Sequence, residues 1–134
     1  MATPDNQILF CFDVGQKRIG TAVGQTITRT ATPLEIIKVL QNKPDWDRIA
    51  ALLQEWQPDK LIVGYPLHMD DDRQEMTEQV DRFIRQLQGR FHIPTESIDE
   101  RLSSYEARQR IKSTYNVDAV AAQVILETWF EEHH

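Results

Sequence analysis

The amino-acid sequence predicts an α/β fold, in which residues 1–134 form a single domain with a mixed sheet of five strands flanked by helices. Near the N-terminus, three apolar runs are separated by gaps too short for a crossover, so antiparallel hairpins are expected there. Later apolar runs alternate with segments of helical spacing, which predicts strands reached by crossover. The last segment is apolar nearly all round, as expected of a helix covered by the sheet.

The first three strands are predicted at residues 8–12, 19–23 and 34–39 and should form an antiparallel meander. The first run, ILFCF, is continuously apolar, which is typical of a strand buried on both faces. Within it Cys11 is expected to be a small core residue.

A helix is predicted over residues 45–56, because apolar residues recur at helical spacing and Asp45 is a suitable N-cap. The LIV run at 61–63 follows and predicts a strand parallel to an earlier one. The tryptophans, including Trp46, occupy positions typical of packing groups.

The C-terminal half predicts one more strand and three more helices. Residues 72–87 form an amphipathic helix, which Gly89 is expected to close as its C-cap. A weaker strand follows at 93–98, and a capping box opens a helix at 103–112. The last helix is predicted over 117–130.

The charge balance, 15 basic against 21 acidic residues with a net charge of −6, argues against a protein that binds nucleic acid through bulk positive charge. However, the excess acid is confined to residues 61–80 and 113–134. The neutral-to-basic remainder could therefore still meet a phosphate backbone. Binding should then be weak and dependent on metal and salt.

No apolar run approaches the ~18 residues that cross a bilayer. The N-terminus lacks the basic start and apolar core of a signal peptide, and a single cysteine cannot form an internal disulfide. A cytoplasmic protein without a membrane partner is expected.

Three acids, Asp13, Glu100 and Asp118, lie beside the ends of predicted buried elements, where a carboxylate needs positive compensation. Ligands of α/β sheets gather at the carboxyl ends of strands. If the three converge, they need a hard divalent cation, Mg²⁺ or Mn²⁺. Two such ions about 4 Å apart can clamp the oxygens of a phosphodiester displacement, so this chemistry points to a nuclease.

Each acid also has a simpler interpretation. Asp13 could be a turn former, and Asp118 could only oppose the helix dipole. Glu100 could pair with Arg101 or another surface cation.

Four segments carry a resemblance that covers essentially the whole chain. They are DVGQKRIGTAV at 13–23, VGYPLHMD at 63–70, DERLSS at 99–104 and VDAVAA at 117–122. In this order they resemble the YqgF/RuvX family of ribonuclease H-like proteins, which is related to Holliday-junction resolvases.

The resemblance implies a ribonuclease H-like fold with Asp13, Glu100 and Asp118 as catalytic, metal-binding acids. It implies a hydrolase acting on ester bonds, a metal-dependent nuclease that processes the 5′ end of pre-16S ribosomal RNA during ribosome biogenesis. The expected cofactor is Mg²⁺ or Mn²⁺.

Nucleic-acid contacts are expected from Lys17, Arg18 and Arg101. Lys17 and Arg18 are neighbours and should point to opposite faces, so only one of the two is expected at a phosphate. Arg101 could instead orient Glu100. Residues 70–72, all aspartates where relatives continue with glycine, predict either a solvated loop with Asp72 as N-cap or a further metal-attracting patch.

Alternative functions remain open. The chain could be a non-catalytic module that binds RNA or a ribosome precursor, or a Holliday-junction resolvase acting on branched DNA. An ATPase of the actin and sugar-kinase type is ranked low, because its site forms between two related domains. The sequence does not distinguish a monomer from a homodimer, and it assigns no role to His133 and His134.

Overall fold

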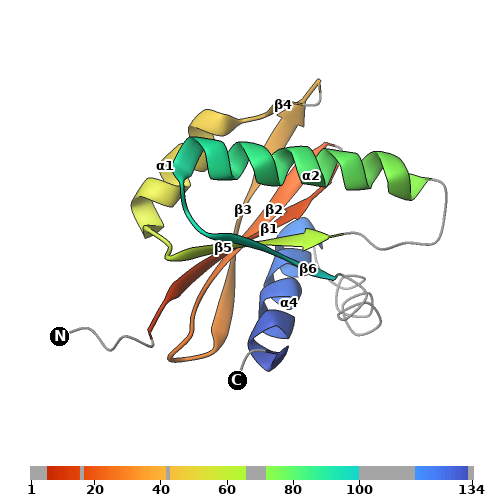
Figure 1. Cartoon of the computed structure of the whole chain (residues 1–134). Helices are drawn as coiled ribbons and strands as arrows, with labels where there is room; N and C mark the ends of the chain where they lie inside the picture. The colour runs from red at the N-terminus through yellow and green to blue at the C-terminus, as the bar shows by residue number, and fades with distance from the viewer. Residues whose placement is uncertain (1–5, 16, 42, 66–71, 100–116, 133–134) are drawn as a thin grey trace.

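The computed structural model describes residues 6–15, 17–41, 43–65, 72–99 and 117–132. These residues form a mixed sheet of six strands in the order β4-β3-β2-β1-β5-β6, with helices on both faces (Figure 1). The strands are β1 (Ile8–Val14), β2 (Arg18–Gln25), β3 (Thr30–Leu40), β4 (Lys43–Pro44), β5 (Lys60–Tyr65) and β6 (Thr95–Asp99). The helices are α1 (Trp46–Trp56), α2 (Asp72–Phe91) and α4 (Val117–Glu132).

The predicted topology is confirmed. Strands β1, β2 and β3 pair antiparallel as a meander, and β5 and β6 add parallel strands on the other side of β1. The prediction of five strands is one short, because β4 adds a two-residue strand at the edge beside β3. A segment this short, containing Pro44, has no detectable strand pattern. The helix predicted over 103–112 lies outside the described residues.

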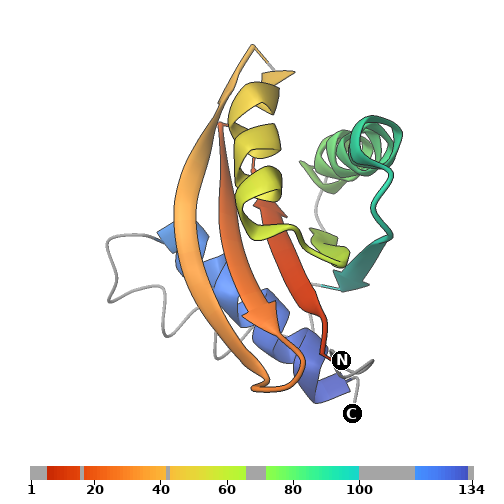
Figure 2. The ribbon, with the colours of Figure 1, turned by 90° about the vertical axis from the view of Figure 1, so that its left-hand side faces the viewer.

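The sheet separates two layers of the core (Figure 2). Helices α1 and α2 cover one face, on which Phe10 and Phe12 of β1 are fully buried. Helix α4 covers the other face, on which Leu9 and Cys11 are fully buried. Because side chains alternate along a strand, β1 contributes to both layers, as its continuously apolar sequence predicts.

Helix α1 begins as predicted. The Asp45 carboxylate accepts a hydrogen bond from the Arg48 backbone N–H at 3.2 Å, so Asp45 is the N-cap. Ile49, Leu52 and Leu53 then form the buried stripe of the helix. Burial of this stripe against the sheet, more than helix propensity, holds the helix in place.

The prediction that Gly89 closes α2 is wrong. The helix continues to Phe91, whose ring packs 6.3 Å from that of Trp46. His92 then takes a left-handed φ of 57° and donates its backbone N–H to the Gln88 carbonyl at 3.0 Å. The burial of Phe91 therefore carries the helix past a glycine that is compatible with helical backbone.

Within the described residues, no helix combines the length and the apolar character that a membrane crossing requires.

Candidate functional site

Asp13 lies near the carboxyl end of β1 and is partly buried. In the alternation of β1 it shares a face with Leu9 and Cys11, so its side chain belongs to the face that α4 covers. Opposite Asp13 in the antiparallel ladder is Gly20 of β2. The carboxylate therefore sits at the rim of the α4 layer, just beyond its apolar core.

Two glycines flank Asp13 on this face. On β2, Gly20 lies opposite Asp13. On the other neighbouring strand, β5, Val63 pairs with Phe12, so the next residue of β5, Gly64, lies beside Asp13. Both glycines are buried. Neither glycine has a side chain that could lie against the carboxylate.

The role of Gly64 was not predicted, because the sequence suggests only a turn after the strand. The signal that could have found it is a glycine inside an otherwise apolar strand, LIVGY. Such a glycine is typical of a close approach to a ligand or to another backbone.

Helix α4 crosses the sheet from the edge where β5 and β6 end toward the start of β1 (Figures 1 and 2). Its C-terminal half lies over the opposite end of the sheet, where the Arg29 guanidinium donates a hydrogen bond to the Phe130 carbonyl. There, a Cβ on Gly24 would lie 3.1 Å from side-chain atoms of both Leu126 and Phe130. Gly24 pairs with Leu9, at the beginning of β1. The first turn of α4, with its partial positive charge, is thus directed to the end of β1 that carries Asp13.

Asp118 is the second residue of α4, as predicted, and therefore belongs to this first turn. Strands β1, β5 and β6 are parallel, so their carboxyl ends share one edge of the sheet. The last residue of β6, Asp99, pairs with Tyr65 at this edge. Glu100 and Arg101 come directly after Asp99 and lie outside the described residues. The described backbone thus brings Asp13, the start of α4 and the end of β6 to one edge.

The two predicted cations of the first turn differ in position. Arg18 opens β2 and shares its face with Gly20, two residues on, so it is a diagonal neighbour of Asp13 across the ladder. Lys17 precedes the strand, and its carbonyl accepts from the Val39 backbone N–H at 2.9 Å. Both side chains are exposed. The strand register favours Arg18 as the cation nearer to Asp13.

The chain turns tightly between β1 and β2. The Gly15 backbone N–H donates to the Arg18 carbonyl at 2.8 Å, and a Cβ on Gly15 would lie 2.8 Å from that same oxygen. Only glycine fits this approach without a shift of the backbone.

The prediction that Asp72 is the N-cap of α2 differs from the structure by one residue, because Asp72 is the first residue of the helix. Asp70 and Asp71 lie outside the described residues.

A mixed sheet with helices on both faces, and a carboxylate at the end of its internal strand β1, agrees with the ribonuclease H-like fold that the motifs predicted. The sequence model of RuvX, described as Holliday junction resolvase, matches residues 7–132. The chain therefore belongs to the RuvX family, which confirms the family and the class of enzyme, a nuclease, that the four motifs predicted.

Curated relatives agree along nearly the full length. A protein of Saccharophagus degradans is 46% identical over 96% of both chains, and one of Hydrogenovibrio crunogenus is 44% identical over 98% of both. Both are named "Putative pre-16S rRNA nuclease".

Solved structures share the fold at low identity. RuvC of Thermus thermophilus in complex with a Holliday junction substrate superposes with a TM-score of 0.58 at 12% identity, covering 95% of this chain and 96% of that one. The fowlpox virus Holliday junction resolvase gives 0.55 at 16% identity, covering 93% and 99%. These likenesses confirm the predicted ribonuclease H-like architecture.

Proposed function

We propose that this protein is a cytoplasmic, metal-dependent nuclease that hydrolyses phosphodiester bonds of pre-16S ribosomal RNA near its 5′ end. Two relatives that carry the corresponding name align with it over at least 96% of both chains. The observation that carries the proposal is the position of Asp13 at the carboxyl end of β1 between Gly20 and Gly64. Glycines on both neighbouring strands favour the close approach of a ligand to this carboxylate.

The donor set suits a hard cation. Asp13 supplies carboxylate oxygens, and Glu100 and Asp118, which follow β6 and open α4, would complete an all-oxygen set. These three acids are the proposed ligands of Mg²⁺ or Mn²⁺. When bound, the metal supplies an activated water and charge stabilisation for the departing oxygen.

The chain's own cations would position the substrate. Arg18 is diagonal to Asp13 on the same face, so its guanidinium can hold a phosphate beside the carboxylate with two N–H groups. Arg101, directly after Glu100 in the sequence, is proposed for a second phosphate contact. Lys17, which precedes β2, is a weaker candidate and would contact the phosphate of a neighbouring nucleotide.

The alternative substrate is branched DNA. The family description and the RuvC structure with a Holliday junction substrate favour it. The same acids would serve either substrate, because both reactions break a phosphodiester bond.

The deciding experiment incubates the protein with precursor 16S RNA and, in parallel, with a four-way DNA junction, each with Mn²⁺ or with chelator. The proposal expects cleavage of the RNA that requires Mn²⁺ and is lost in Asp13→Asn. Cleavage of the junction alone would replace RNA by branched DNA as the substrate. If neither is cut, and folded Asp13→Asn binds RNA as the wild type does, the chain is a binding module and the proposal fails.

A further inference from the structure

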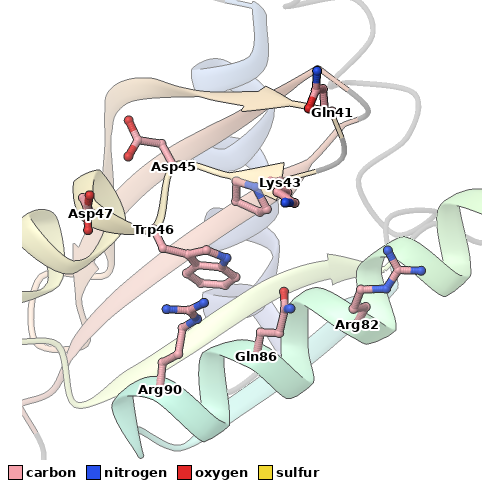
Figure 3. A pocket seen from close by; sticks show the side chains of 9 residues that line it. Gln41, Lys43, Asp45, Trp46, Asp47, Arg82, Gln86 and Arg90 are labelled. Atoms are coloured by element: carbon pink, nitrogen blue, oxygen red, sulfur yellow. The ribbon is translucent and has the colours of Figure 1, made fainter.

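A pocket of about 650 Å³ opens on the face of the sheet away from Asp13, between α1 and α2. This is the size range of small-molecule sites. Figure 3 shows its side chains, which come from the end of β3, from β4, from the start of α1 and from one stripe of α2. The residues used below are Lys43, Asp45, Trp46, Arg82, Gln86 and Arg90.

An aromatic ring and a guanidinium form the centre of the pocket. The Trp46 ring stacks on Phe83 with centroids 5.4 Å apart and an interplanar angle of 18°. The guanidinium carbon of Arg90 lies 4.5 Å from the Trp46 centroid. This cation–π contact holds an exposed guanidinium in place, and the planes of arginine and of aromatic rings are surfaces on which unstacked bases pack.

The pocket is polarised. Asp45 and Asp47 lie at the α1 end, whereas Lys43 and Arg82 lie toward the other end (Figure 3). Among the described residues, no carboxylate pairs with Lys43 or Arg82. By contrast, Arg48 on the outside of α1 is already paired with Glu35. The pocket thus offers acceptors at one end, a stacking plane in the middle and, at the other end, cations with which no carboxylate of the described residues pairs.

The end of the pocket that holds Lys43 and Arg82 is the end nearer to the last residues of β1. A smaller hollow shares Arg82 and Gln86 with the pocket and is also lined by Val14, the residue after Asp13. Gln79 of α2 donates its side-chain N–H to the Gly15 carbonyl at 3.3 Å, which ties α2 to the turn after β1. The cationic end of the pocket therefore lies close to the end of β1 that carries Asp13, on the opposite face of the sheet.

We propose that this pocket binds one nucleotide of a single-stranded RNA segment that flanks the cleavage site. A base would stack on Arg90, its polar edge toward Asp45 and Gln86, with its phosphate on Lys43 and Arg82. The inference rests on the proposed function for the identity of the substrate. It specifies a single strand, because bases stacked in a duplex cannot reach such a plane.

The test uses fluorescence anisotropy of a labelled single-stranded RNA octamer and of a hairpin duplex of the same composition. The protein is the full chain carrying Asp13→Asn, which prevents cleavage. Arg82→Gln and Arg90→Gln are each expected to weaken binding of the single strand about fivefold or more. Arg82→Gln should also reduce the slope of log affinity against log salt by about 0.7.

Arg85→Gln is the matched control, since Arg85 is an exposed arginine of α2 that does not line the pocket. It should change affinity by less than twofold. The indole N–H signal of Trp46 in NMR spectra should shift on titration with the octamer. Equal weakening by Arg85→Gln and Arg82→Gln would overturn the pocket, because bulk charge would explain both.

Failure of the pocket and failure of the proposed function give different results. Normal RNA binding by the pocket variants, while the wild type still cleaves precursor RNA, overturns the pocket alone. Pocket-dependent binding of the octamer by a protein that cleaves no RNA supports the pocket and overturns the nuclease. Equally strong, pocket-dependent binding of the hairpin contradicts the single-strand assignment.

Discussion

Asp13 of β1 and Gly20 of β2 lie directly opposite one another in the antiparallel ladder, on the face that α4 covers. Four residues further along β2, and on the same face, Gly24 lies under Leu126 and Phe130. One strand thus carries two glycines for different reasons. Gly20 is the cross-strand neighbour of the Asp13 carboxylate, and Gly24 lets the helix approach the sheet.

Gly20→Ala should impair the site more than the fold. A methyl group opposite Asp13 occupies the space proposed for a cation, so we expect affinity for Mn²⁺ to fall about 10–100-fold, as for other changes around a metal site. Calorimetric titration with Mn²⁺ measures this, and far-ultraviolet circular dichroism checks the fold. Unchanged Mn²⁺ affinity in a folded variant would show that the space beside Asp13 is not used.

Gly24→Ala should instead destabilise the fold. A Cβ there would lie 2.4 Å from the Thr30 carbonyl oxygen and 3.1 Å from side-chain atoms of Leu126 and Phe130. Because a backbone oxygen cannot swing away, we expect the free energy of unfolding to fall by about 1–3 kcal/mol. Urea denaturation measures it, and a loss below a few tenths of a kcal/mol would contradict the close packing of α4.

Gly89→Ala is the opposite case. Gly89 lies within α2, is exposed, and a Cβ there would meet nothing within 4 Å. Alanine has the higher helix propensity, so the free energy of unfolding should rise by up to about 1 kcal/mol. The same urea series tests it, and a loss of stability would mean that α2 ends earlier than Phe91.

The ion pair between Glu35 and Arg48 predicts a small pH dependence. The hydrogen bond from Arg48 lowers the pKa of the Glu35 carboxyl below its ordinary value of 4.5. The stability that it contributes is therefore present above pH 4.5 and is lost as the pH falls through the lowered pKa. The pair is exposed and the effect should be slight.

Arg48→Gln should return the pKa of Glu35 toward 4.5. It should also remove the loss of stability at low pH that the Glu35–Arg48 pair causes. A carbon-detected NMR titration of the Glu35 carboxyl in both proteins measures this directly. An identical titration curve in the variant would show that the pair does not persist in solution.

Much of the fold could be predicted from local signals. The N-cap at Asp45 and the buried run of β1 were readable, because each depends on a few neighbouring residues. The end of α2 was not, since it depends on Phe91 packing against Trp46, far away in sequence. The extra strand β4 forms only because the chain after β3 folds back on it.

The candidate site, too, could be predicted only in part from the sequence. The position of Asp13 at a strand end followed from the sequence, and so did the place of Asp118 in the first turn of α4. The flanking role of Gly64 required the parallel register of β1 and β5. The pocket around Trp46 could not be foreseen, because its side chains come from elements that meet only in the folded chain.

Asp13 is proposed as a ligand of the catalytic metal. Calorimetric titration of the wild type, Asp13→Asn and Asp47→Asn with Mn²⁺ tests this role most directly, since Asp47 is an exposed carboxylate of α1 away from this edge. We predict that the wild type and Asp47→Asn bind Mn²⁺ alike, and that Asp13→Asn binds at least a hundredfold more weakly, a loss of about 2.8 kcal/mol or more. Equal Mn²⁺ affinity in a folded Asp13→Asn variant would show that Asp13 does not bind the metal.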